Sequence, residues 1–158
     1  MFQQSVGFYN ANAVAGDRAS QNVSIYTPFN YLAKNDVTIG GFVWADTTDP
    51  TKKAAASGSG KPLGFAERQI AHYNYDLTSE GTMIVRDRGP LTIAVRGDFY
   101  VKGENAAVIG NKVFASNTDG SKIKFGAAGS SVEGYTETTF VALTAGDAGE
   151  LIIISNWA

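Results

Sequence analysis

The closing region of the chain constrains the fold most. From Lys112 to Trp157 it reads "KVFASNTDGSKIKFGAAGSSVEGYTETTFVALTAGDAGELIIISNW". Short apolar runs alternate there with turns that carry glycine or aspartate, which is typical of antiparallel hairpins. The Asp-Gly pair within Asn117–Gly120 favours a tight turn because glycine takes a positive φ, and Ala145–Gly149 separates the last two runs. Leu151–Ile154 does not alternate, so we expect both of its faces to be covered, by the domain itself or by another subunit.

Further β runs lie upstream of this region. They are Val37–Ala45, Leu63–Ile70, Thr82–Arg86 and Leu91–Lys102. Asp87–Pro90 has turn composition, and we expect it to join the flanking runs into a hairpin. No convincing helix interrupts the series. At least about eight short strands at regular spacing predict an all-β fold, either an antiparallel β-barrel or jelly roll, or a tulip-like sandwich.

The chain divides into an N-terminal arm and one domain. Residues 1–30 combine small and polar residues with scattered aromatics, too few to form a core, so we predict an extended arm that orders on a partner or along its own domain. Residues 31–158 are predicted to form a single β domain, as suits a chain of 158 residues. Within it, the Ser-, Gly- and Ala-rich stretch at about 46–61 predicts a mobile loop. Its "GSGK" is no phosphate loop, because Ala55 and Pro62 occupy positions that require glycine and Ser or Thr.

Composition excludes several classes of partner. The net charge is −2 and 18% of residues are charged, so there is no basic surface for nucleic acid. No stretch approaches the roughly eighteen apolar residues of a membrane helix, and we expect no membrane partner. Without cysteine the chain has no disulfide and no thiolate nucleophile. The N-terminus lacks the basic and apolar regions of a secretory signal, so we expect synthesis in the cytoplasm without export by that route.

Catalytic groups are scarce. The single histidine, His72, has no serine nearby in a nucleophile setting. A glycosidase needs two carboxylates facing one another across a cleft, whereas the candidates are spread among loops and strand ends. These candidates are Glu67, Glu80, Asp98, Glu133 and Glu137. The acidic loops lack the alternating oxygens of a calcium site, and Arg96–Gly97–Asp98, an adhesion tripeptide in form, reads more simply as a strand with a kink at Gly97. We predict no enzyme, no cofactor and no metal.

Three ordered segments resemble the small cement, or decoration, proteins of tailed-phage capsids. "PLGFAERQI" at Pro62–Ile70 is similar to their central glycine-aromatic strand, and "GPLTIAVRGDFYVK" at Gly89–Lys102 to the β pair that follows it. The region from Gly110 to Trp157 resembles their closing part, with its Lys-Val-Phe strand, Asp-Gly turn and final Ile-Ser-x-Trp. The resemblance covers roughly residues 62–157, and residues 5–20 match the leader segments more loosely.

This resemblance implies a barrel or tulip-like jelly roll that works as a homo-oligomer, with a trimer favoured and a dimer as the alternative. It implies a place on the outer surface of the expanded virion head after a period in the host cytoplasm, and a bridging role between neighbouring subunits of the major capsid protein. The residues expected to contact the capsid are Val6, Phe8, Tyr9, Gly16 and Asp17. Those expected in the core or a subunit interface are Phe140, Ile152, Ile154 and Trp157.

Two other functions stay open at this point. The chain could be a virion-surface carbohydrate- or receptor-binding jelly roll that uses Trp44, Tyr73 and Tyr75 as sugar platforms. It could also be a small β-fold hydrolase that uses pairs of carboxylates. Neither accounts for the ordered set of resemblances.

Overall fold

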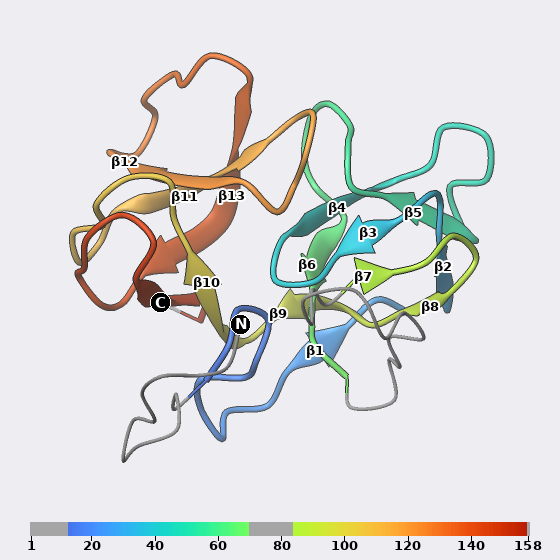
Figure 1. Ribbon diagram of the computed structural model, residues 1–158, viewed down its shortest axis with the longest axis horizontal. Helices are drawn as coiled ribbons and strands as arrows, with labels where there is room; N and C mark the ends of the chain where they lie inside the picture. The colour runs from blue at the N-terminus through green and yellow to red at the C-terminus, as the bar shows by residue number, and fades with distance from the viewer. Residues whose placement is uncertain (1–12, 70–83, 158) are drawn as a thin grey trace, which may run out of the picture.

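The computed structural model describes residues 13–69 and 84–157, which form short β-strands joined by turns and loops, with no helix among them (Figure 1). The all-β prediction is confirmed. In chain order the strands are β1 (Ile25–Tyr26), β2 (Tyr31–Ala33), β3 (Val37–Thr38), β4 (Phe42–Ala45), β5 (Lys53–Ala55), β6 (Gly64–Ala66), β7 (Ile84–Val85), β8 (Pro90–Leu91), β9 (Ile93–Arg96), β10 (Asp98–Lys102), β11 (Lys112–Ser116), β12 (Ile123–Gly126), β13 (Tyr135–Ala142) and β14 (Leu151–Ser155).

A curled seven-stranded sheet occupies one half of the molecule, on the right of Figure 1, in the order β1-β9-β6-β4-β5-β2-β8. Its neighbours are antiparallel except for β2 and β5, which are parallel. β8 and β9 are separated by Thr92 alone, yet they pair near opposite ends of the order. The sheet therefore curls round on itself, but β8 pairs only with β2, so the described strands do not close into a barrel.

A five-stranded antiparallel sheet, β10-β14-β13-β11-β12, forms the other half. β11 and β12 pair across the Asn117–Gly120 turn with Val113 opposite Phe125, so the predicted hairpin is confirmed. β13 and β14 also pair, with Ala142 opposite Ile154. The chain passes from β9 to β10 through Gly97, and so one extended run belongs to both sheets. These two sheets form a sandwich-like arrangement, and β3 and β7 pair as a separate two-stranded sheet.

The hairpin predicted across Asp87–Pro90 is wrong. The turn itself exists, because the amide of Gly89 donates to the carbonyl of Arg86 at 2.8 Å. However, the strands on either side do not pair with each other: β7 pairs with β3, and β8 pairs with β2. Turn composition indicated where the chain bends. It carried no information about which distant strand β7 or β8 would pair with.

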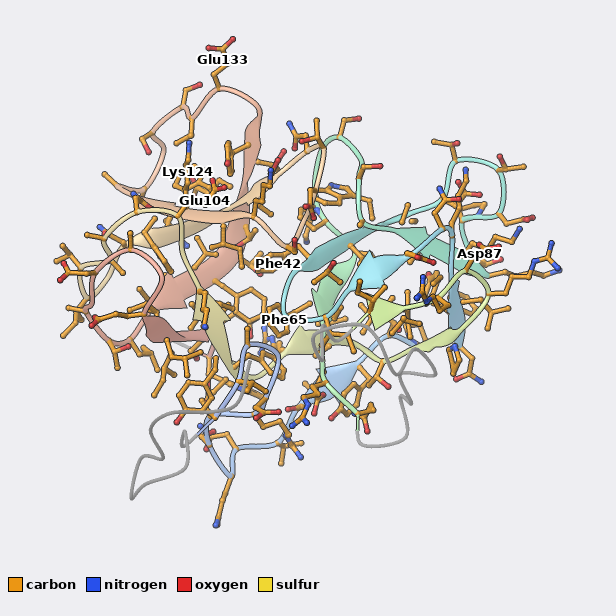
Figure 2. The ribbon with its side chains drawn as sticks, in the orientation of Figure 1. Phe42, Phe65, Asp87, Glu104, Lys124 and Glu133 are labelled. Atoms are coloured by element: carbon orange, nitrogen blue, oxygen red, sulfur yellow. The ribbon has the colours of Figure 1, made fainter. Side chains whose placement is uncertain are left out.

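Four phenylalanines form the centre of the interface between the sheets. The Phe65 ring stacks on Phe99 with centroids 4.7 Å apart, and Phe42 contacts Phe65 and Phe140 edge-on at 5.4 Å each. Phe42 and Phe65 come from the seven-stranded sheet and lie in the middle of the molecule (Figure 2), whereas Phe99 and Phe140 come from the other sheet. All four are at most 2% exposed, so truncating one to alanine should cost about 3–5 kcal/mol.

A second core fills the inside of the curled sheet. β4 shows how both faces are used, since Phe42 and Trp44 face the interface between the sheets and Val43 faces the second core. In β14 the pattern is simpler: Ile152 and Ile154 are buried, whereas Leu151 and Ile153 on the opposite face are half-buried. The domain itself thus covers one face of Leu151–Ile154 fully and the other only in part.

The predicted arm and loop both contribute strands. β1, from residues 1–30, pairs with β9 at the edge of the seven-stranded sheet. β5, from the 46–61 stretch, lies between β4 and β2 in the same sheet. The division into arm and domain, and the mobility of residues 46–61, stay predictions.

Candidate functional site

The described start of the chain lies along the outer edge of β10. The Gly16 amide donates to the Tyr100 carbonyl at 2.8 Å, the Tyr100 amide to the Asp17 carbonyl at 2.9 Å, and the Ala19 amide to the Asp98 carbonyl at 2.8 Å. An unpaired sheet edge invites association with other chains. Residues 16–19 cover this edge and are held to the five-stranded sheet as an added strand would be.

Gly16 and Gly40 fix where this N-terminal segment crosses the β3–β4 turn. Both have positive φ, 95° and 85°. A Cβ on Gly16 would lie 2.7 Å from Cγ2 of Ile39, and one on Gly40 would lie 2.9 Å from the carbonyl carbon of Ala15. The two backbones can approach this closely only because neither residue has a side chain.

Asp98 ties the same segment down through its side chain. Its Oδ2 accepts hydrogen bonds from the Ser20 hydroxyl at 2.6 Å and from the side-chain Nδ2 of Asn22 at 2.7 Å. Burial raises the pKa of Asp98, but hydrogen bonds from Ser155, Ser20 and Asn22 outweigh this effect, and the pKa lies below its usual value. Since Asp98 is 6% exposed, the Arg96–Gly97–Asp98 tripeptide is not displayed for adhesion.

Glu67 is a second buried carboxylate under the segment. It follows β6, is 3% exposed, and has Nε of Arg18 at 3.8 Å as its ion-pair partner. Burial raises the pKa of Glu67, with the Tyr26 hydroxyl and Arg18 acting in the opposite direction, and its Oε2 makes no hydrogen bond. The neighbouring Arg68 pairs with Asp17 at 3.1 Å. Backbone and charge contacts together hold residues 16–22 to the domain, and we call this set of contacts the anchor.

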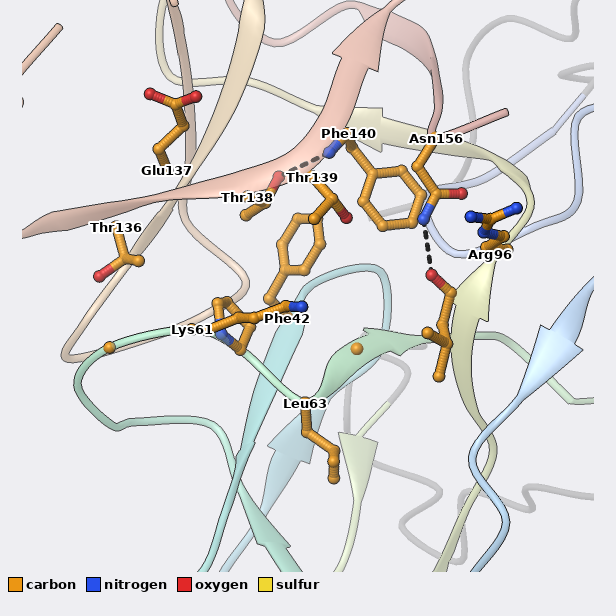
Figure 3. Close-up of a pocket in the computed structure, with 14 residues that line it drawn as sticks. Phe42, Lys61, Leu63, Arg96, Thr136, Glu137, Thr138, Thr139, Phe140 and Asn156 are labelled. Atoms are coloured by element: carbon orange, nitrogen blue, oxygen red, sulfur yellow. Dashed lines mark hydrogen bonds between the residues drawn. The ribbon is translucent and has the colours of Figure 1, made fainter. Parts of the chain in front are cut away.

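A groove of about 690 Å³ opens between the two sheets on another part of the surface (Figure 3). One wall is β13 and the other is the loop before β6 together with the end of β9. Its lining residues are Phe42, Gly60, Lys61, Pro62, Leu63, Gly64, Val95, Arg96, Thr136, Glu137, Thr138, Thr139, Phe140 and Asn156. We call it the β13 groove. Apolar side chains form much of the lining, and hydroxyl and charged groups surround them.

Asn156 lines this groove and is bonded to the crossing between the two sheets. Its side-chain oxygen accepts from the Gly97 amide at 3.0 Å. Its side-chain nitrogen donates to the Val95 carbonyl at 2.6 Å (Figure 3). The guanidinium of Arg96 lies 5.2 Å from the ring centroid of Trp157. These contacts hold the end of the chain against β9. Sequence reasoning missed the groove because its walls come from distant segments, although it did single out the Ile-Ser-x-Trp ending.

The predicted site residues fall into three groups. Val6, Phe8 and Tyr9 lie outside the described residues, as do His72, Glu80, Tyr73 and Tyr75. Gly16 is buried against Gly40, and Asp17 is half-buried beside Arg68. Phe140, Ile152 and Ile154 are buried within the chain, whereas Trp157 is 43% exposed. The structure thus brings Gly16 and Asp17 together at the anchor and places Trp157 beside the groove.

The features of the rival functions fit the structure less well. Trp44 is 3% exposed and its indole N–H donates to the Gly60 carbonyl, so its ring is no open sugar platform. Glu67 and Asp98 bind the N-terminal segment, and Glu137 accepts from the Gly129 amide. No three metal-ligating side chains gather among residues 13–69 and 84–157. The same residues contain no helix long and apolar enough to cross a membrane.

Comparison with known proteins identifies the family. The family model described as XM1 gp53 minor capsid protein matches residues 2–156. Among solved structures, a chain from "The capsid of Myoviridae Phage XM1" has the same fold, with a TM-score of 0.68 over 98% of this chain and 96% of that one, at 16% identity. No curated protein matches the chain. The match of the family model spans both sheets and the N-terminal segment, and the chain belongs to the XM1 gp53 minor capsid protein family, a family of phage capsid-associated proteins.

Proposed function

We propose that this protein is a cement protein that binds the outer surface of the expanded phage head and bridges neighbouring subunits of the major capsid protein. The observation that carries the proposal is the membership in a minor capsid protein family over residues 2–156, joined to the resemblance to capsid cement proteins. A small protein that touches several capsid subunits at once must be released from all of them together, so modest contacts give a large combined effect. The protein is a structural component in this proposal, without catalysis, cofactor or nucleic-acid partner.

The anchor described above supports a role for the arm. Residues 16–19 are bonded to β10, and Asp98 and Arg68 hold the same segment from the side. Any contact made by residues 1–12 is therefore connected to a fixed point on the domain. We propose that Val6, Phe8 and Tyr9 contact the major capsid protein, with Gly16 and Asp17 at the base of the arm.

Exposed apolar side chains favour self-association. Val108 and Ile109 are 62% and 67% exposed on a turn, and Leu143 is 41% exposed on the segment that bonds to that turn. The Gly110 amide donates to the Ala142 carbonyl at 2.9 Å, which brings the two segments together. We propose that this patch belongs to a homo-oligomer contact, with a trimer favoured over a dimer. Repetition around a symmetric oligomer would multiply each weak capsid contact.

Co-sedimentation tests the proposal directly. The purified protein is mixed with undecorated expanded heads of the cognate major capsid protein, and with unexpanded shells as the control. Saturable binding to expanded heads alone, at a fixed ratio of copies to capsid subunits, is the expected result. Deletion of residues 1–12 should abolish this binding, and it removes none of the described hydrogen bonds. Absence of binding to either shell would overturn the cement role, and a glycan array would then test the carbohydrate-binding alternative.

A further inference from the structure

One half of β13 is an open sheet edge. On one side β13 pairs with β11, but on the other side β14 reaches only Val141 and Ala142. No described strand pairs with residues 136–140 on that side. The β13 groove runs along this edge and is lined by the same five residues (Figure 3).

The other edges of the five-stranded sheet are covered by the chain itself. Residues 16–19 cover β10. Along β12, the Asn105 side chain accepts from the Phe125 amide and donates to the Phe125 carbonyl, both at 2.8 Å, as a neighbouring strand would. The Glu104 amide bonds to the Ile123 carbonyl in the same way. Two of the edges are therefore covered and one is left open.

The edge of β13 is open because of the path that the chain takes after β14. Ser155 lies opposite Val141, so β14 continued in register would place residues 156–158 opposite residues 138–140. Instead the two hydrogen bonds of Asn156 draw the chain toward β9. The Phe140 amide, at the irregular part of β13, is bonded to the Thr138 hydroxyl at 3.2 Å. The groove therefore lies where β14 leaves the edge of β13.

The charges beside this edge indicate what it accepts. Lys61 and Arg96 line the groove, and neither lies within salt-bridge distance of a carboxylate among the described residues. Glu137, the carboxylate in the lining, is already engaged by the Gly129 amide at 2.9 Å. Extended backbone alongside β13 and a carboxylate near Lys61 and Arg96 would complement the groove. Residues 1–16 of a second copy contain no acidic residue, so they lack this carboxylate.

We propose that the β13 groove receives an extended, acidic segment of the major capsid protein, which adds to the open edge of β13 as a further strand. Strand addition uses main-chain hydrogen bonds for affinity and side-chain pockets for specificity. Phe42, Leu63 and Val95 offer the apolar pockets, and Lys61 and Arg96 select the carboxylate. This inference rests on the proposed cement function and adds a second contact to that of the arm.

Site-specific cross-linking tests the occupant. The chain has no cysteine, so Thr139→Cys introduces a single thiol at the exposed edge of β13, which a benzophenone maleimide labels. Thr47→Cys, also exposed and outside the groove, is the matched control. On expanded heads, irradiation should join the Thr139 label to the major capsid protein within an acidic, extended stretch. Loss of head binding by the Thr139-labelled protein alone also supports groove occupancy.

Three results would overturn the inference while the cement function stands. These are an adduct with a second copy of this chain, equal adducts from both positions, or normal head occupancy without any adduct from Thr139. If the unmodified protein fails to bind expanded heads, the cement function falls and this inference falls with it.

Charge reversal provides an independent measurement. Lys61→Glu combined with Arg96→Glu should weaken binding to expanded heads by about tenfold, and the remaining affinity should depend less on salt. Lys52→Glu with Lys102→Glu carries the same change in charge at exposed positions outside the groove and should bind as the unmodified protein does. Circular dichroism and thermal melting check that both variants fold. Equal affinity of the two double variants would contradict the role of the groove cations.

Discussion

The side chain of Asn156 bonds to both sides of the sheet crossing, accepting from the Gly97 amide at 3.0 Å and donating to the Val95 carbonyl at 2.6 Å. Gly97 is where the chain leaves the seven-stranded sheet for the five-stranded one. A single amide near the end of the chain therefore connects the last strand to the run that joins the two sheets. This contact stabilises the connection between the two sheets. It also directs the chain away from β13, whose edge stays open.

Replacing Asn156 should destabilise the protein and alter the groove. Asn156→Ala removes both hydrogen bonds and should lower the free energy of unfolding by about 1–3 kcal/mol. Asn156→Asp keeps the acceptor for Gly97 but places a carboxylate against the Val95 carbonyl, so it should be at least as destabilising near neutral pH. Urea unfolding of the three proteins gives the ranking. An unchanged midpoint for Asn156→Ala would show that the two hydrogen bonds contribute nothing.

Alanine at Gly40 should be far more costly than alanine at Gly110. Both glycines have similar positive φ, 85° and 88°, so the conformational penalty is shared. A Cβ at Gly40 meets backbone atoms of the N-terminal segment at 2.9–3.0 Å, whereas a Cβ at Gly110 meets nothing within 4 Å. We expect about 1 kcal/mol for Gly110→Ala and at least about 2 kcal/mol more for Gly40→Ala. The difference in melting temperature between the two variants measures the steric cost at Gly40. Equal shifts would contradict the close approach of the N-terminal segment to the β3–β4 turn.

Acid should weaken the anchor through Asp98. The pKa of Asp98 is lower in the folded protein than in the unfolded chain. The stabilisation is therefore fully present above the unfolded pKa, near 3.9, and is lost as the pH falls through the folded pKa. Asp98→Asn should flatten the stability profile below about pH 4 and lower stability at pH 7. Chemical unfolding across that range measures the profile, and parallel curves for the two proteins would refute the assignment.

Glu67 should have the opposite dependence on pH. Burial raises the pKa of this carboxyl in the folded state, so ionisation of Glu67 costs stability as the pH rises through the interval above its unfolded value. Glu67→Gln keeps the shape and removes the charge, and we expect a melting temperature at pH 7 equal to or above that of the unmodified protein. A marked loss at pH 7 would instead show that the pair with Arg18 outweighs burial.

Deletion of residues 1–20 should destabilise the domain, unlike deletion of residues 1–12. The longer deletion exposes the edge of β10 and removes Ser20, one of the two donors to Oδ2 of Asp98. We expect increased aggregation and earlier hydrogen exchange of the Tyr100 amide, whose acceptor is the Asp17 carbonyl. Exchange measured by NMR distinguishes the two deletions. Identical protection of Tyr100 in both would contradict the anchoring role of residues 16–19.

The sequence predicted local features of the fold well and long-range pairing poorly. The Asp119–Gly120 corner specified a hairpin because both of its strands are adjacent in the chain. Asp87–Pro90 has an equally clear turn, but β7 pairs 46–48 residues upstream and β8 pairs 58–60 residues upstream, which no local pattern encodes. The parallel pair of β2 and β5 was hidden for the same reason, since β5 lies in a stretch whose composition is that of a loop.

The sequence predicted the protein family and several buried residues, but not where the candidate site lies. Motif order led to a phage capsid protein family, and the aromatic and aliphatic residues at Phe140, Ile152 and Ile154 lie in buried positions. The anchor and the groove could not be read in advance because each assembles from separate segments. Asp98, for example, sits in a tripeptide that suggests display, and only the fold places it beneath Ser20 and Asn22.

The separation of Ser20 from Asp98, 78 positions along the chain, has a consequence for how the protein is made. Residues 16–22 leave the ribosome well before β10, on which they dock. The segment must therefore wait unattached while the seven-stranded sheet and the strands after it are synthesised. Residues 16–22 therefore stay accessible to chaperones and to other newly made copies until β10 has been synthesised.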